Sequence, residues 1–270
     1  MRRRISNFFI ATMILLIAGF PLLSLIGLSL KTRLAALSTS LLFTPTLDNF
    51  RLVFTDRDAA HALANTVAVS CASAIIGLVV GVPSGYWLSR TTVRAKDLSL
   101  FSIIALRMLP PIGILLPLYT WFRAVRLLDT KASLILALAA TTSVFAAWMM
   151  KGFFDQIPVR FEEAALVDGA NSRTTLISIV LPLALPGMLL TGLFALVTSW
   201  NEFLFALILT SYEGRTLNVL IPSLVTPQGT QWGEIAALSV IATAPVFVVV
   251  FAARTFFVRG ILYGTIREER

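Results

Sequence analysis

The chain has 270 residues, of which 57% are hydrophobic and only 13% are charged. Soluble domains carry about 25% charged residues, so this composition, with a mean hydropathy of +0.86, excludes an ordinary soluble protein and predicts a protein of the lipid bilayer. The net charge of +8 does not indicate nucleic-acid binding, because the basic residues lie between apolar runs and form no single patch; they are better explained as signals of membrane topology.

The first apolar run covers residues 8–30 and follows the basic residues Arg2, Arg3 and Arg4. It is longer than the roughly 20 apolar residues that cross a bilayer. A signal peptide also has a basic start before an apolar run, but no small-residue cleavage site follows this one directly. The run is therefore expected to be an uncleaved first span.

The second apolar run covers residues 62–89 and follows a polar stretch that is expected on the outer surface. Gly77, Gly81 and Gly85 lie on it at every fourth position. This spacing lets another membrane helix approach closely. The second run is therefore expected to be a span that packs tightly against a neighbour.

The third expected span, residues 98–122, is irregular. It contains Arg107 together with residues that break helices, namely Pro110, Pro111, Gly113 and Pro117. Broken helices inside a membrane often line a cavity, and a buried arginine costs about 2.5 to 3.5 kcal/mol on insertion scales. Arg107 is expected either to face a cavity or a partner, or to extend to the inner membrane surface, and the sequence leaves both open.

Three more spans are predicted, over residues 132–150, 179–212 and 235–253. The expected fold is an all-α membrane protein with about six spans in a single domain, residues 1–270. With the N-terminus inside, the inner segments hold 13 lysines and arginines and the outer segments hold 8. This bias predicts that both termini, and the segment 151–178, are cytoplasmic.

The segment 151–178 is neither plainly membrane-spanning nor plainly a loop. With the residues that follow, it predicts two short helices joined by a sharp turn. Pro158 suits a first helical position, where a missing N–H costs nothing, and Glu162 and Glu163 follow where carboxylates stabilise the positive end of a helix. Gly169 is a natural helix stop, and Asn171 or Ser172 can cap the next helix. By themselves these residues favour an amphipathic surface loop; a helix that docks on another protein is the alternative.

The sequence shows no sign of catalytic chemistry. It has no glycine-rich phosphate loop and no metalloprotease or hydrolase motif. Its single cysteine, Cys71, and single histidine, His61, exclude a disulfide within the chain, a Cys-rich metal site and a histidine metal cluster. We expect no catalytic, cofactor-binding or metal-binding residues, and no enzyme activity of the chain by itself.

Polar and aromatic groups at membrane depth are the candidates for a substrate path, because an ionisable residue in a span is a functional-site hypothesis. The candidates are Arg107, Tyr119, Trp200, Asn201 and Glu202. Aromatic faces and hydrogen-bonding groups of this kind suit a sugar. The alternative is that the aromatic residues anchor the chain at the interface and that Asn201 and Glu202 cap a helix.

One pattern in the cytoplasmic segment resembles a known family. Glu163-Ala164-Ala165, Gly169, Ile179 and Leu181-Pro182 match, at every fixed position, the EAA loop of binding-protein-dependent ABC importer permeases. The resemblance implies the type I ABC importer permease fold. It also implies that the first helix of this loop docks into a cleft on a separate ATPase subunit. The residues expected at that contact are Glu162, Glu163, Ala164, Ala165, Asp168 and Gly169.

The resemblance extends over nearly the whole chain and is to the carbohydrate-uptake branch, in particular to the second permease subunit of maltose-type systems. The further matching stretches are Asn65-Thr66, Met108 to Pro111 with Pro117 to Tyr119, Lys151 to Phe154 with Ile157-Pro158, Trp200 to Phe203, Trp232 with Ala236-Ala237, and Gly260 with Gly264. The resemblance implies a bacterial inner-membrane complex with a second permease, ATPase subunits that hold ATP and Mg²⁺, an extracytoplasmic sugar-binding protein, a carbohydrate substrate and surrounding lipid.

Two other functions are compatible with a multispan chain: an ion-coupled secondary transporter and a membrane scaffold subunit. The few intramembrane acids, the lack of a visible repeat and the EAA pattern speak against the secondary transporter. A scaffold would tolerate changes at Asn201 and Arg107.

Overall fold

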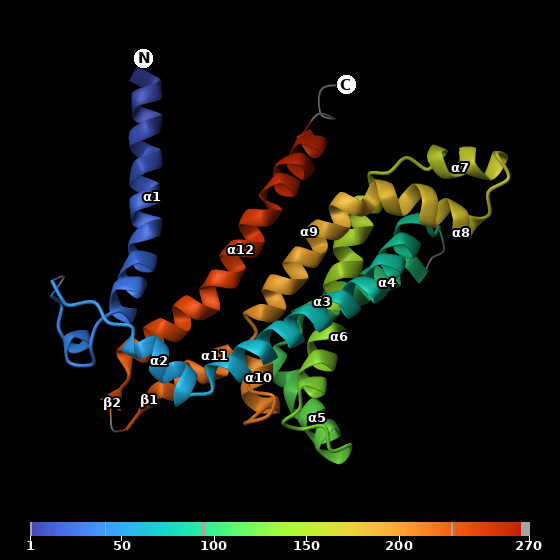
Figure 1. Cartoon of the computed structure of the whole chain (residues 1–270). Coiled ribbons are helices and arrows are strands. Elements are labelled where there is room, and N and C mark those ends of the chain that lie inside the picture. Colours follow the sequence, from blue (N-terminus) through green and yellow to red (C-terminus); the bar gives the residue numbers. More distant parts are fainter. Residues whose placement is uncertain (1, 41, 93–94, 228, 266–270) are drawn as a thin grey trace. The chain divides into compact units, whose positions relative to one another are not determined.

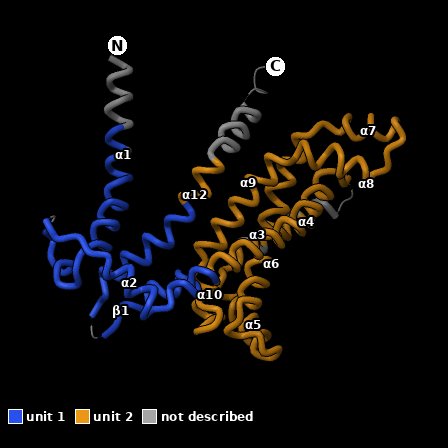
Figure 2. The backbone as a smooth tube through the Cα atoms, in the orientation of Figure 1, with its two compact units in different colours: residues 1–64, 216–246 blue, residues 65–215, 247–270 orange. Residues whose placement is uncertain are grey.

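A computed structural model describes the backbone of residues 2–40, 42–92, 95–227 and 229–265. It describes side chains between residues 12 and 253, apart from 15, 41, 93–97, 100, 104, 106–107 and 228. Helices dominate these residues (Figure 1). The chain divides into two compact units, one of residues 1–64 and 216–246 and the other of residues 65–215 and 247–270 (Figure 2).

The longer helices are α1 (Arg2–Ser29), α2 (Asp48–Thr55), α3 (Ala59–Arg90), α4 (Ala95–Met108), α5 (Pro111–Ala124), α6 (Lys131–Asp155), α7 (Arg160–Val167), α9 (Leu181–Trp200), α10 (Leu204–Leu209) and α12 (Trp232–Thr265). The shorter elements are η1 (Ala35–Leu37), α8 (Ser172–Thr175), η2 (Leu176–Val180), α11 (Leu217–Leu220), η3 (Pro222–Leu224), β1 (Val225–Thr226) and β2 (Gly229–Thr230).

Five helical stretches of the described residues are long and apolar enough to cross a membrane. They are Thr12–Ser29, Ala59–Arg90, Lys131–Asp155, Ser172–Trp200 and Trp232–Ala253. The remaining expected span, residues 98–122, is divided into α4 and α5, each of 14 residues. At 1.5 Å per residue each of these helices is about 21 Å long, shorter than the roughly 30 Å hydrocarbon core.

Prolines cause this division. Pro110 has extended backbone (φ −63°, ψ 128°), and Pro111 begins α5. A proline has no N–H to donate and disfavours helical backbone in the residue before it. The predicted irregularity of residues 98–122 is therefore present in the structure, as a break between two helices.

The glycine stripe on α3 packs against α6, as its spacing predicts. A Cβ atom added at Gly77 would lie 2.6 Å from Thr142 Oγ1, and one added at Gly85 would lie 2.8 Å from Met150 Cβ. A Cβ at Gly81 would overlap that of Ala146. Real Cβ atoms essentially never come this close, so the two backbones approach each other at a distance that only glycine permits.

The fifth expected span, residues 179–212, is also interrupted. Helical backbone runs from α8 through a π-helical turn, η2, into α9, and it ends at Trp200. Residues 201–203 then separate α9 from α10. A Cβ at Gly187 would overlap the Phe153 ring of α6, so α9 also lies close against α6.

In the first unit, α2, α11 and the beginning of α12 share a core that includes Val53, Leu217, Leu220 and Leu238. Arg57 Nε donates a hydrogen bond to Glu234 Oε2 at 2.8 Å. This bond raises the pKa of the Arg57 guanidinium against the opposing effect of burial. The short strands β1 and β2 pair antiparallel and lead into α12.

Candidate coupling site

Helices α7 and α8 lie at one end of the second unit, and α5 and α10 lie at the opposite end (Figure 1, Figure 2). Helix α7 begins at Arg160, two residues after its expected start at Pro158. The reason is a tighter turn before the helix, in which the Phe161 N–H donates to the Pro158 carbonyl at 3.2 Å. Glu162 and Glu163 are in the first turn of α7, as predicted.

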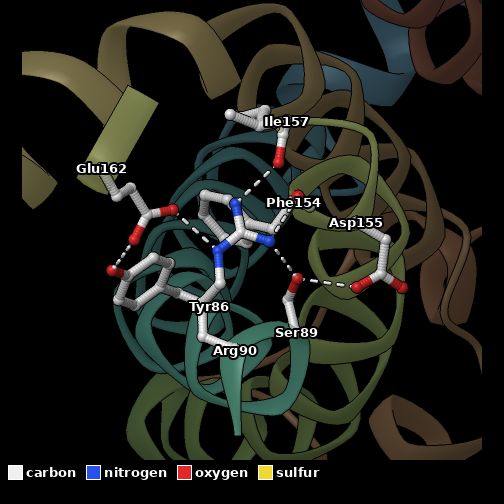
Figure 3. A network of polar contacts seen from close by, with 7 residues as sticks. All are labelled: Tyr86, Ser89, Arg90, Phe154, Asp155, Ile157 and Glu162. Atoms are coloured by element: carbon white, nitrogen blue, oxygen red, sulfur yellow. Dashed lines mark hydrogen bonds and ion pairs between the residues drawn. The ribbon is translucent and has the colours of Figure 1, made fainter. Parts of the chain in front are cut away.

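One face of α7 is directed into the protein. Glu162 and Ala165 are buried. Glu162 Oε1 accepts from Arg90 Nε at 2.7 Å, and Glu162 Oε2 accepts from the Tyr86 hydroxyl at 2.7 Å. Figure 3 shows the guanidinium between Glu162 on one side and the end of α6 on the other. Of the residues expected at an ATPase contact, the structure therefore places Glu162 and Ala165 against this chain.

The rest of Arg90 binds α6 and the connection to α7. Arg90 Nη1 donates to the Phe154 carbonyl at 3.1 Å and to Ser89 Oγ at 3.0 Å, and Nη2 donates to the Ile157 carbonyl at 2.9 Å. Ser89 Oγ in turn donates to Asp155 Oδ1 at 2.7 Å. The Arg90 guanidinium also lies 6.0 Å from the centroid of the Tyr86 ring. One side chain thus connects the ends of α3 and α6 with α7.

The other face of α7 is exposed and largely apolar. Phe161, Leu166 and Val167 are 43%, 52% and 87% exposed. Glu163, Ala164, Asp168 and Gly169 are exposed as well. We call the exposed set Phe161, Glu163, Ala164, Leu166, Val167 and Asp168 the coupling face. Exposed apolar patches with polar residues at their edges mark sites of contact with another protein or with a membrane.

The turn after α7 has the predicted chemistry. Gly169 adopts a left-handed conformation with φ +84°, which costs other residues about 1 to 2 kcal/mol. Asn171 caps α8, with Oδ1 accepting from the Thr174 N–H at 2.9 Å. The helix stop at Gly169 and the cap at Asn171 are both confirmed. They return the chain from α7 into the long helix of α8, η2 and α9.

The candidates for a substrate path are spread over α4, α5 and the break after α9. Arg107 belongs to α4, but its side chain lies outside the described residues. Tyr119 is half-buried on α5, and Trp200 is buried at the end of α9. Asn201 Nδ2 donates to the Val197 carbonyl at 2.8 Å. Glu202 Oε1 accepts from the Phe205 N–H at 3.1 Å.

A cavity of about 590 Å³ lies between α5, α6, α9 and α10. Its lining is mainly apolar and aromatic, and includes Leu118, Trp121, Phe145, Phe194, Thr198 and Phe205. None of the candidates Tyr119, Trp200, Asn201 and Glu202 lines it. The Thr198 hydroxyl already donates to the carbonyl of Phe194. In this chain alone the cavity therefore offers few polar groups to a hydrophilic ligand.

At the opposite end of the unit, Asp129 joins the turn before α6 to the loop after α10. Its Oδ1 accepts from the N–H groups of Ser211, Tyr212 and Gly214 at 2.7, 2.8 and 3.3 Å. Burial of this carboxylate favours its neutral form, but the backbone donors outweigh burial and the pKa of Asp129 is lowered. No sequence pattern indicates this contact, because the donors are backbone groups more than 80 residues away.

A family model for the binding-protein-dependent transport system inner membrane component matches residues 74–263, which include the coupling face, Arg90 and the cavity. The chain belongs to this family. This confirms the predicted membership among binding-protein-dependent importer permeases and the location in the inner membrane. The permease shares 31% identity over 264 residues with the sulfoquinovosyl glycerol transport system permease protein SmoH of Agrobacterium fabrum, covering 96% of this chain and 93% of SmoH.

Two further comparisons agree. The permease is 29% identical over 260 residues to the trehalose transport system permease protein SugB of Mycobacterium tuberculosis, with 95% of each chain covered. Its fold matches a crystal structure of a bacterial ABC transporter involved in the import of the acidic polysaccharide alginate. The TM-score is 0.79 and the identity 23%, over 94% of this chain and 95% of the other. The predicted permease fold is confirmed.

Sequence reasoning missed the role of Arg90. In the sequence it is one basic residue of a short connection, which charge counting assigns to membrane topology. One signal was present. Tyr86 and Arg90 are four residues apart, on one face of α3, and Glu162 lies in the first turn of α7, the short helix that follows α6. The pattern could not show that α6 brings these two helices together.

Proposed function

We propose that this permease couples ATP hydrolysis on a separate subunit to the passage of a carbohydrate across the inner membrane. The observation that carries the proposal is the coupling face, an exposed apolar helix face held at one end of the second unit by buried polar contacts. The permease itself would contribute half of the translocation path, and the partner ATPase would hold ATP and Mg²⁺.

The chemistry of the coupling face suits a groove on another protein. Phe161, Leu166 and Val167 would gain by leaving water, which is the main driving force of association. An apolar helix face that lies in a hydrophobic groove is a recurring mode of recognition. Ala164 permits close approach, and Glu163 and Asp168 would meet basic groups at the rim. The contact transmits work only if its free energy differs between the open and closed ATPase.

The side of the membrane follows from charge. With the N-terminus inside, the segments assigned to the inner side hold more lysines and arginines than the others, and this bias supports a cytoplasmic location of both termini and the coupling face. An ATPase can reach the coupling face only on that side. Labelling of Gln156→Cys by a membrane-impermeant maleimide, in a Cys71→Ser background, tests this placement: protection in intact cells and reaction in inverted vesicles is the expected result.

The docking experiment is co-purification of the tagged permease from detergent-solubilised membranes. We expect an ATPase and a second permease to be recovered with the wild-type chain. Val167→Glu should lose the ATPase and retain the second permease, because it adds a charge to the most exposed apolar position of α7. The matched control is Gln156→Glu, an exposed position between α6 and α7 outside the coupling face. Wild-type ATPase recovery and uptake in Val167→Glu would refute the docking role.

A carbohydrate is the proposed substrate because relatives that match almost the full length are named for sulfoquinovosyl glycerol and trehalose transport. The candidates for the substrate path in this chain are Arg107, Tyr119, Trp200, Asn201 and Glu202. The second permease would supply the other half of the path. Stimulation of ATP hydrolysis by binding protein loaded from a panel of sugars tests the substrate class. Arg107→Ala should change the uptake profile across that panel more than it changes assembly; an unchanged profile would remove Arg107 from the path.

A further inference from the structure

Arg90 is the last residue of α3, and it occupies a position where three segments meet. Its guanidinium binds the Glu162 carboxylate of α7, the Phe154 carbonyl of α6 and the Ile157 carbonyl of the connection between them. The side chains of Arg90 and Glu162 are only 17% and 11% exposed. These contacts are therefore shielded from solvent, unlike an ordinary surface ion pair.

Only arginine can make this set of contacts. Its planar fork presents five donors in fixed directions, and here Nε, Nη1 and Nη2 are all used. The Phe154 carbonyl lies in the last turn of α6, where it also accepts from the Ile157 N–H at 3.0 Å, and the Ile157 carbonyl lies just after the helix. A lysine would keep the positive charge but could not direct donors to the same acceptors.

Both carboxylate oxygens of Glu162 also have partners within the chain. Arg90 binds one of its oxygens and the Tyr86 hydroxyl binds the other, both at 2.7 Å (Figure 3). The network continues through Ser89 to Asp155 at the end of α6. Because both oxygens point inward, Glu162 differs in role from its neighbour Glu163, which is exposed.

Helix α7 packs against α8 and η2, and this network attaches it to α3 and α6. It has eight residues, and isolated helices shorter than about 12 to 15 residues are marginal in water. Residues 156–159 connect its start to α6, and the turn at Gly169, which is in a left-handed conformation, connects its end to α8. Without the network, bending of these connections would absorb a displacement of α7 relative to the ends of α3 and α6.

We infer that Arg90 and Glu162 are positioning residues for transport: they make α7 move as one rigid body with the ends of α3 and α6, so that a movement of the ATPase reaches the spans. The inference rests on the proposed docking of an ATPase on the coupling face. It assigns Glu162 to force transmission within the permease and leaves the partner contact to the exposed residues of α7.

The first test measures sugar uptake per ATP hydrolysed by the assembled complex in proteoliposomes. Arg90→Ala should lower this ratio by at least about fivefold, the lower end of typical coupling between sites. Glu162→Gln should lower it less, and Tyr86→Phe least, because that variant retains the ion pair. Arg90→Lys should not restore it. The control is Arg57→Ala, which removes a positive charge from the ion pair with Glu234 in the first unit, outside the network, and should leave the ratio unchanged.

The second test measures the rigid attachment directly. Cys71 is the only cysteine, so a Cys71→Ser chain can carry spin labels at Arg160→Cys at the start of α7 and Trp87→Cys on α3, both exposed positions. The distance between the labels should be narrowly distributed and equal in the nucleotide-free and ATP-bound complex. Arg90→Ala should broaden the distribution.

The outcomes separate three possibilities. A lower ratio and a broader distance distribution support the inference. A smaller yield of complex with an unchanged ratio and an unchanged distribution overturns it, because Arg90 and Glu162 then serve folding alone. If the wild-type chain recovers no ATPase, the proposed function and the transport role both fail, and the distance measurement on the permease still decides whether Arg90 holds α7 in place.

Discussion

Substitution of Gly85 by alanine should destabilise the permease through the contact between α3 and α6. A Cβ at this position would lie 2.8 Å from both the Ala147 carbonyl oxygen and Met150 Cβ. Carbon atoms pack at about 3.5 to 4.0 Å, so the helices must separate by about 0.7 Å. Backbone atoms of α6 cannot turn aside as a flexible side chain can. Overpacking of this kind costs about 1 to 3 kcal/mol.

Gly152 provides a matched control. It is also a helical glycine, but a Cβ there has no atom within 4 Å. Both substitutions gain about 1 kcal/mol of helix propensity, and this gain cancels in the difference between the two variants. Gly85→Ala should therefore be about 1 to 3 kcal/mol less stable than Gly152→Ala.

The assay is unfolding of the purified chain in mixed dodecyl maltoside and sodium dodecyl sulfate micelles, followed by the fluorescence of its five tryptophans. Gly152→Ala should unfold at or above the wild-type concentration of sodium dodecyl sulfate, and Gly85→Ala clearly below it. Equal midpoints for the two variants would refute the close approach of α3 and α6.

Three further predictions concern other contacts. Asp129→Ala should lower stability by about 1 to 2 kcal/mol near neutral pH. Because the pKa of Asp129 is lowered on folding, the difference should be complete above the unfolded value of about 3.9 and should shrink in melting curves as the pH falls through the folded value. The part that remains at low pH is the cost of alanine in the left-handed backbone of residue 129. Gly187→Ala should lower the melting temperature, and Phe153→Ala in the same chain should restore part of it, because the added Cβ overlaps that ring; independent, additive effects would contradict this. Gly169→Ala should lower uptake more than Gly169→Asn, since asparagine tolerates the left-handed conformation better; equal uptake would show that the turn carries no strain.

The sequence determined the class of protein and most of its helices. Long uncharged runs can satisfy their backbone groups in lipid only as helices, so composition and length were sufficient to predict spans. The breaks in the third and fifth expected spans were only partly visible. Pro110 and Pro111 indicated the first. The second, at residues 201–203, includes a capping contact of Glu202, which the sequence suggested only as the alternative to a substrate path.

The EAA pattern, with Gly169 and Asn171, also determined where α7 and its turn lie, because capping and left-handed backbone are local properties of one or two residues. Which face of α7 is exposed was decided by tertiary structure alone. Glu162 and Glu163 are adjacent and chemically alike. Glu162 is directed inward because Arg90 and Tyr86, which belong to a helix distant in the sequence, bind its carboxylate. A buried carboxylate requires such partners, and the residues that supply them are more than 70 positions away.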